Sequence, residues 1–272
     1  MRAWVMQSKV LLAGIGVFLV GSVLTPTDLS SQDLVQQVSR VTEGTVRLSY
    51  PTRPNVQICD QGIKMGEHQM MWHSRDQDEE PTNCRPGPVE IEVGVQGGSV
   101  REIEVVRRVQ DRTGGATDLG TVSAQQAVEF LLDAARTGGR SGKGEEDAVF
   151  PTVLADVEAV WEDLLVLARD GGLDEDVRTS ALFWVGQEAA EVVTKGLAGV
   201  ALDEEEDQEV REAAVFALSR RPPDEGVPIL MQVARTAKEA ETRRSAMFWL
   251  AQSEDERVYA FFEEVLLGRG GD

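Results

Sequence analysis

Apolar positions in the second half of the chain recur about every 33 residues. Each of four units begins with the motif alanine, apolar residue, phenylalanine, and the steps between the alanines are 33, 33 and 32 residues. These alanines are Ala148, Ala181, Ala214 and Ala246. A second apolar anchor follows each alanine by 16 residues, at Leu164, Leu197, Leu230 and Phe262. The spacing predicts four stacked units of two helices each.

Three of the four units also carry an arginine three residues before the alanine, namely Arg178, Arg211 and Arg243. An acid precedes each arginine by two residues, where it would lie at the start of a helix and interact with exposed N–H groups. Because equivalent residues of a stacked array lie side by side, we expect a ladder in which each guanidinium binds an acid or carbonyl of an adjoining unit. Arg211 should contribute most to stability, since it has a regular unit on both sides.

The repeated segment, residues 123–268, resembles HEAT repeats, and in particular the short HEAT-like repeats named after phycobilisome lyases. Its period is shorter than the usual HEAT length of about 40 residues, but the signatures of tetratricopeptide and ankyrin repeats are absent. The resemblance implies an α-solenoid whose surface binds other proteins. It implies bilin-lyase activity through the family name alone, and no segment resembles a bilin-attachment motif.

In the N-terminal half the period of the apolar positions changes to two. Apolar and polar residues alternate over residues 46–50, and again over residues 89–95, which meet Gly97-Gly98 and a return run over residues 100–105. This pattern predicts a β-hairpin, and the prolines in the rest of the segment limit it to a small antiparallel β-module. The predicted fold class is therefore α+β, with a disulfide-tied antiparallel β-module followed by a short α-solenoid of HEAT-like helical pairs.

The chain divides into four parts on this interpretation. Residues 1–30 form a signal peptide or N-terminal anchor, residues 31–110 the β-rich module, residues 111–122 a linker rich in Gly and Asp, and residues 123–272 the solenoid.

Local signals place helix boundaries in the solenoid. Ser123-x-x-Gln126 matches a capping box and predicts a helix that reaches Thr137, at the position of a capping half-repeat. Pro151 should begin or kink the first helix of unit one, and Pro222-Pro223 should mark a turn in unit three.

The N-terminal segment has the features of an export signal. Arg2 and Lys9 precede fifteen uncharged residues, Val10 to Leu24, which are too few to span a bilayer of about 30 Å comfortably. The best cleavage site, Val20-Gly-Ser22, is poor, so an uncleaved anchor remains an alternative. We expect an exported bacterial protein of the periplasm, the cell envelope or the medium, held at the membrane only if the segment stays uncleaved.

Charge and cysteine content narrow the classes of partner. The 47 acidic and 27 basic residues give a formal charge of −20, which repels nucleic acid and anionic lipid. In an oxidising compartment, the only two cysteines, Cys59 and Cys84, are expected to form a disulfide.

Two clusters are candidates for metal binding. A segment rich in soft ligands suits Cu(I) and suggests a periplasmic copper-binding protein as the alternative function. Its candidate ligands are Met65, His68, Met70, Met71 and His73. A loop whose Met and Trp side chains cover the sheet is the other interpretation, and a zinc site that includes both cysteines lacks the usual close spacing. The acidic run Asp203 to Asp207 is either a solvated turn, a weak calcium site or a docking patch for a basic partner.

The sequence carries no catalytic signature: neither a G-x-S-x-G elbow nor an H-E-x-x-H pair is present, so we expect no enzyme. The pairs Phe183-Trp184 and Phe248-Trp249 are expected to fill the core between helices. Adjacent helical residues point about 100° apart, however, so one ring of each pair could line a groove. The predicted function is an exported protein–protein interaction scaffold that binds another, unidentified cell-envelope protein through the array and requires no cofactor.

Overall fold

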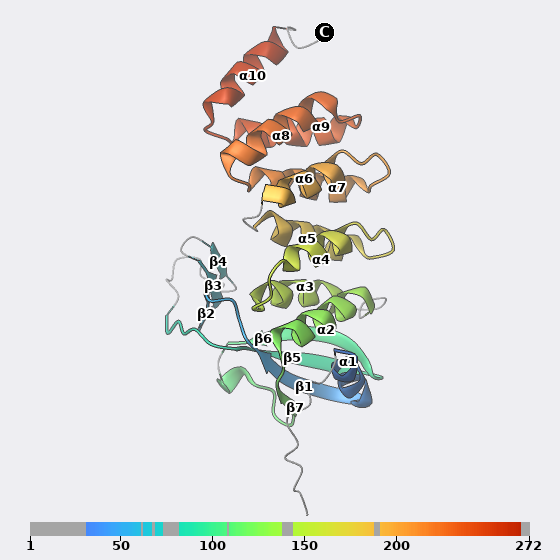
Figure 1. Ribbon diagram of the computed structural model, residues 1–272. Coiled ribbons are helices and arrows are strands. Elements are labelled where there is room, and N and C mark those ends of the chain that lie inside the picture. Colours follow the sequence, from blue (N-terminus) through green and yellow to red (C-terminus); the bar gives the residue numbers. More distant parts are fainter. Residues whose placement is uncertain are drawn as a thin grey trace, which may run out of the picture.

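The computed structural model describes residues 31–60, 62–66, 69–72, 82–107, 109–137, 144–187 and 191–267. A β-rich module lies at one end, and four pairs of helices stack away from it in chain order (Figure 1). The predicted α+β fold class is confirmed. The predicted export segment, residues 1–30, lies outside the described residues, and none of the described helices is long and apolar enough to cross a membrane.

The main sheet has the strand order β6-β5-β1-β7. Its strands are β1 (Glu43–Tyr50), β5 (Val89–Gln96), β6 (Ser99–Val106) and β7 (Thr117–Thr121). The predicted hairpin is present as the antiparallel pair β5 and β6, and β5 also pairs antiparallel with β1. The apolar residues of β1 and β5 that alternate in the sequence are all buried.

The fourth strand corrects two predictions. β7 pairs with β1 in parallel, so the sheet is mixed and not antiparallel throughout. The predicted linker, residues 111–122, therefore contains a strand of the sheet. The sequence contains no signal for this strand, because Leu119 is the only apolar residue between Thr117 and Thr121. An edge strand that is largely exposed needs no alternating apolar pattern.

Two helices adjoin the sheet (Figure 1). Helix α1 (Ser31–Arg40) falls where only strands were predicted, although Leu34 and Val38 have helical spacing and are both buried. Helix α2 (Ala124–Thr137) begins with the predicted capping box. Ser123 Oγ accepts from Gln126 N at 3.2 Å, while Gln126 Oε1 accepts from Ser123 N at 2.9 Å.

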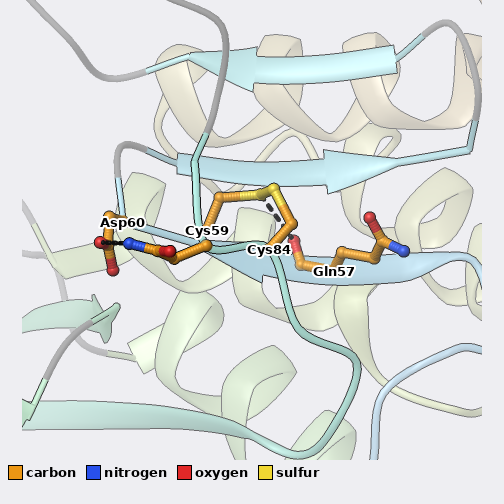
Figure 2. Close-up of a disulfide and its surroundings, with 5 residues drawn as sticks. Gln57, Cys59, Asp60 and Cys84 are labelled. Atoms are coloured by element: carbon orange, nitrogen blue, oxygen red, sulfur yellow. Dashed lines mark hydrogen bonds between the residues drawn. A yellow bond between two sulfur atoms is a disulfide. The ribbon is translucent and has the colours of Figure 1, made fainter.

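A second, smaller sheet consists of β2 (Val56–Cys59), β3 (Gly62–Met65) and β4 (Gln69–Trp72). The predicted disulfide joins the end of β2 to Cys84 with an S–S distance of 2.02 Å (Figure 2). Next to it, Ile58 and Arg85 exchange two backbone hydrogen bonds of 2.9 and 3.0 Å. The disulfide therefore holds the segment before β5 against the small sheet.

The helical pairs follow the predicted register. They are α3 (Gly144–Leu154) with α4 (Val160–Ala168), α5 (Glu175–Gly186) with α6 (Glu191–Ala201), α7 (Gln208–Ser219) with α8 (Pro223–Thr236), and α9 (Ala240–Ala251) with α10 (Glu256–Leu266). All four motif alanines are fully buried, as are the anchors of the first three units. In the last unit Phe262 is only half-buried and Phe261 takes the buried position, so the register there shifts by one residue.

Pro151 lies inside α3 and does not begin it, and it marks the junction between sheet and repeats. The buried Tyr50 hydroxyl, at the end of β1, donates to the Pro151 carbonyl at 2.7 Å. Burial raises the pKa of Tyr50, so the hydroxyl remains a donor. Arg53 N also donates to Leu154 O, and Asp156 N donates to Pro51 O, both at 3.0 Å. The buried residues of the module and the repeats accordingly form one continuous core.

Candidate interaction groove

The first arginine of the predicted ladder ties unit two to unit three. Arg178 is 1% exposed. Its Nε donates to Ala168 O at 3.0 Å, its Nη1 donates to Asp207 Oδ2 at 2.7 Å, and its Nη2 pairs with Glu206. Glu206 and Asp207 precede the first helix of the next unit, so this guanidinium crosses the boundary between units as predicted.

The other two arginines make different contacts. Arg211 is 8% exposed, and its Nε donates to the hydroxyl of the buried Thr242 in the next unit at 3.3 Å. Its Nη1 donates to the carbonyls of Asp203 and Glu206. Arg243 is half-buried, and its Nη1 donates to the carbonyls of Ala237 and Lys238, which precede its own helix. The ladder thus weakens toward the end of the array, and Arg178 makes the strongest set of bonds.

The acidic run Asp203 to Asp207 takes part in this stacking. In addition to the two acids that bind Arg178, Glu204 pairs with Lys238 of the following turn at 2.6 Å. The run is therefore neither a wholly solvated turn nor a free patch. Sequence reasoning missed this role because the run precedes α7 and its basic partners lie 28 to 34 residues away.

Aromatic side chains form a continuous row along the first helices of the units. Ring centroids lie 5.1 Å apart between Phe150 and Trp184, 6.2 Å between Phe183 and Phe216, and 4.9 Å between Phe216 and Trp249. Trp184 is 7% exposed, in line with the predicted core role. Phe248, at the last unit, is 56% exposed.

The row also borders a groove of about 690 Å³, within the range of about 300–1,000 Å³ typical of ligand sites. One wall is β6 with Glu102 to Val105 and the following Arg107, and the opposite wall is α3 and α5. Gly62 and Ile63 of the small sheet contribute to the lining. Both Phe183 and Trp184 reach the groove, so the prediction that one ring of this pair could line such a surface finds support here.

β6 is an edge strand, because it ends the strand order of the main sheet. Among the described residues, Glu102 to Val106 make no backbone–backbone hydrogen bond outside the ladder with β5. An edge strand directs the N–H and C=O groups of every second residue away from its neighbour. The groove is therefore walled on one side by backbone groups that could pair with another strand.

The polar face of β6 is acidic where it meets the groove. Glu102 and Glu104 are both exposed, and no ion pair between described residues involves either of them. Partial burial, the charge of Glu102 and a hydrogen bond with Glu102 raise the pKa of Glu104. Glu92, which lies directly across the ladder from Glu104, has hydrogen-bond partners of its own. Burial opposes its ionisation, but hydrogen bonds from Thr113 and Arg47 hold the pKa of Glu92 below its ordinary value.

A second pair of carboxyls lies between the first turns of α5 and α7. A side-chain hydrogen bond with Glu209 raises the pKa of Glu175 to about 7, with further contributions from desolvation and the charges of Glu209, Asp207 and Asp176. Glu175 therefore keeps its proton up to near neutral pH.

The described structure does not test the predicted copper site, because Met65 is the only one of its five candidate ligands whose side chain it describes. Met65 is buried in β3, and Met70 and Met71 lie on β4. His68 and His73 lie outside the described residues. Within those residues, no group of three His, Cys, Asp or Glu side chains is arranged to hold a metal ion.

Sequence reasoning also missed a buried polar cluster on the second helices. Arg221 is 5% exposed and donates to Thr194 Oγ1 at 3.0 Å and to Glu225 Oε2 at 2.7 Å. Thr194 Oγ1 in turn donates to Glu225 at 2.7 Å. This cluster links α6 to α8. The three residues do not recur at the repeat period, so the pattern of the units did not reveal them.

The ladder geometry revises the expected order of the arginine variants. We predict that Arg178→Ala lowers the free energy of unfolding most, by about 3 kcal/mol, because it leaves two acids without their buried partner. Arg211→Ala should cost about 2 kcal/mol and Arg243→Ala about 1 kcal/mol, as expected when a guanidinium loses hydrogen bonds to uncharged acceptors and is less buried at the second position. Urea unfolding followed by circular dichroism measures all three, with exposed Arg244→Ala as the control. Equal losses at the three positions would refute a graded ladder.

The raised pKa of Glu175 predicts a pH dependence of stability. The folded chain holds the proton of this carboxyl up to about pH 7, whereas Glu175 in the unfolded chain releases it near the ordinary glutamate pKa of 4.5. Raising the pH through this interval therefore destabilises the folded state. Glu175→Gln should unfold like the wild type near pH 4 and be more stable than the wild type near pH 8. The control is Glu158→Gln, which replaces an exposed acid between α3 and α4. A stability difference between Glu175→Gln and the wild type that does not change with pH would rule out the raised pKa of Glu175.

Comparison with known families identifies part of the array. Residues 197–269, from α6 to beyond α10, match the family of HEAT repeats. No curated protein matches the chain. The finer resemblance to the repeats named after phycobilisome lyases stays a prediction. The C-terminal region of the chain is a HEAT-repeat array, an architecture that suggests a scaffold for protein–protein interaction.

Proposed function

We propose that this protein is an exported scaffold that binds another protein of the cell envelope without catalysing a reaction. The groove between β6 and α5 is the observation that carries the proposal, because it joins a sheet edge, an aromatic wall and acidic side chains in one concave surface. Surfaces of this kind, with aromatic residues at their centre and polar groups at the rim, are typical of protein interfaces.

The way the two parts are joined supports this role. A solenoid offers a stiff surface whose side chains can vary without disturbing the core. Here the first repeat shares its core with the sheet, so the two groove walls keep their distance from one another. The disulfide Cys59–Cys84 supports export, since such bonds persist in oxidising compartments.

Site-specific photo-crosslinking in the cells that produce the chain tests this function. A photoreactive residue in place of Thr179, which lines the groove, should give a discrete adduct with one protein in the envelope fraction. The same residue in place of Val166, 62% exposed on α4 and outside the groove lining, should give none. Similar adducts from both positions, or adducts found only in the cytoplasmic fraction, would contradict the proposal.

A further inference from the structure

We propose that the groove binds an extended peptide segment as an additional strand on β6, and that the side chains of this segment alternate between basic and apolar. The inference rests on the proposed function and specifies the chemistry of the partner. Binding of the partner would make β6 an inner strand of the sheet.

The backbone of β6 supplies the first reason. β6 ends the main sheet, and its residues Glu102 to Val106 make no other backbone–backbone hydrogen bond within the described part of the chain. A peptide that pairs with a sheet edge gains affinity from main-chain hydrogen bonds and specificity from alternate side chains. The groove runs along this edge, from Glu102 to Val105 and on to Arg107.

One face of the added strand would meet acids. Glu102 and Glu104 share a face of β6, since successive strand residues point to opposite sides. Across the ladder, Glu104 faces Glu92, which already binds Arg47 at 2.6 Å. Among the described residues, no salt bridge joins a cation to Glu102 or Glu104, and the only cation whose charge acts on Glu104 is Arg107 at the end of the groove. Lysine or arginine residues of an added strand would stand beside both carboxylates as opposite-charge cross-strand pairs.

The other face of the added strand would meet apolar groups. Ile103 and Val105 of β6 point to the side where α3 packs, and Phe150, Phe183 and Trp184 line the groove beyond them. Valine, isoleucine or phenylalanine side chains of the partner would fill this space. The chain thus offers a carboxylate-lined side and an aromatic side to one strand.

These two sides also determine the register. A slip of one residue would turn every basic side chain toward the aromatic wall and every apolar side chain toward the carboxylates. Only one alignment of an alternating peptide therefore satisfies both walls. A peptide of the same composition in which the basic residues are consecutive cannot satisfy them at all.

A direct test titrates a fluorescent peptide, Lys-Val-Lys-Phe-Lys-Val-Lys, with the purified full-length chain in its oxidised form and follows anisotropy. The alternating peptide should bind at least about tenfold more tightly than a block peptide of the same composition. Equal affinity for the two peptides would overturn the proposal, because charge attraction alone depends on composition and not on alternation.

N-methylation of the peptide separates strand addition from other modes of binding. Two versions carry N-methyl groups at the odd or at the even positions, and each version lacks one set of backbone donors. Only one set faces β6 in the allowed register, so one version should bind about as well as the parent and the other at least about tenfold more weakly. If both versions bind alike, the added strand is refuted.

Charge variants of the protein test the acidic wall. Glu102→Lys combined with Glu104→Lys should weaken binding of the alternating peptide about tenfold or more, because two attractions become repulsions. Glu254→Lys combined with Glu158→Lys changes the net charge equally on exposed loops away from the groove and should leave the affinity within about twofold. Circular dichroism establishes that both variants fold. An equal loss in both variants would show that net charge alone attracts the peptide and would overturn the proposal.

Failure of this inference is distinguishable from failure of the proposed function. If crosslinks from Thr179 persist while both N-methylated peptides bind alike, the scaffold stands and the strand addition falls. If the alternating peptide binds as described and no crosslink forms in the envelope, the strand addition stands and the proposed envelope partner falls.

Discussion

The groove depends on one buried junction, where the end of β1 meets the first repeat. The Tyr50 hydroxyl donates a hydrogen bond to the carbonyl of Pro151 inside α3. Two backbone hydrogen bonds, one from Arg53 to Leu154 and one from Asp156 to Pro51, continue the contact. A buried carbonyl without its donor costs about 1–3 kcal/mol, so this contact strongly favours a single position of the sheet relative to α3. Without that position, β6 and α5 would not face one another across a space of defined width. The aromatic wall and the strand edge are therefore properties of the joint and not of either part alone.

From this junction the stacking passes through nearest neighbours. Arg178 of unit two binds acids of unit three, and Arg211 of unit three donates a hydrogen bond to the buried Thr242 of unit four. The aromatic row also continues from unit two to unit three. Gly186 shows how close the helices approach, since a Cβ there would lie 2.9 Å from that of Ala217. The contacts between units become fewer toward α10, where Phe248 is exposed and Arg243 binds only carbonyls that precede its own helix. The stiffest part of the array is thus the part that lines the groove.

Much of this fold follows from short-range pattern. The 33-residue period located the buried alanines, the capping box placed the start of α2, and alternation located β1, β5 and β6. What the pattern did not reveal depends on residues far apart in the chain. β7 has one apolar residue and joins the sheet only because β1 offers an edge, and α1 was overlooked between the predicted export segment and the first β signal. The groove itself brings together β6 and α5, about 80 residues apart, and no local spacing reports such a meeting.

Hydrogen exchange of Tyr50→Phe tests most directly whether sheet and repeats form one body. The variant removes one buried hydrogen bond and keeps the ring, at a cost of about 1–2 kcal/mol, or roughly tenfold in local opening. If sheet and repeats share one core, the amides of β5, α3 and α5 should all exchange faster, while those of α9 and α10 exchange as in the wild type. Faster exchange confined to the sheet, with α3 and α5 as protected as before, would contradict a shared core and with it the fixed groove.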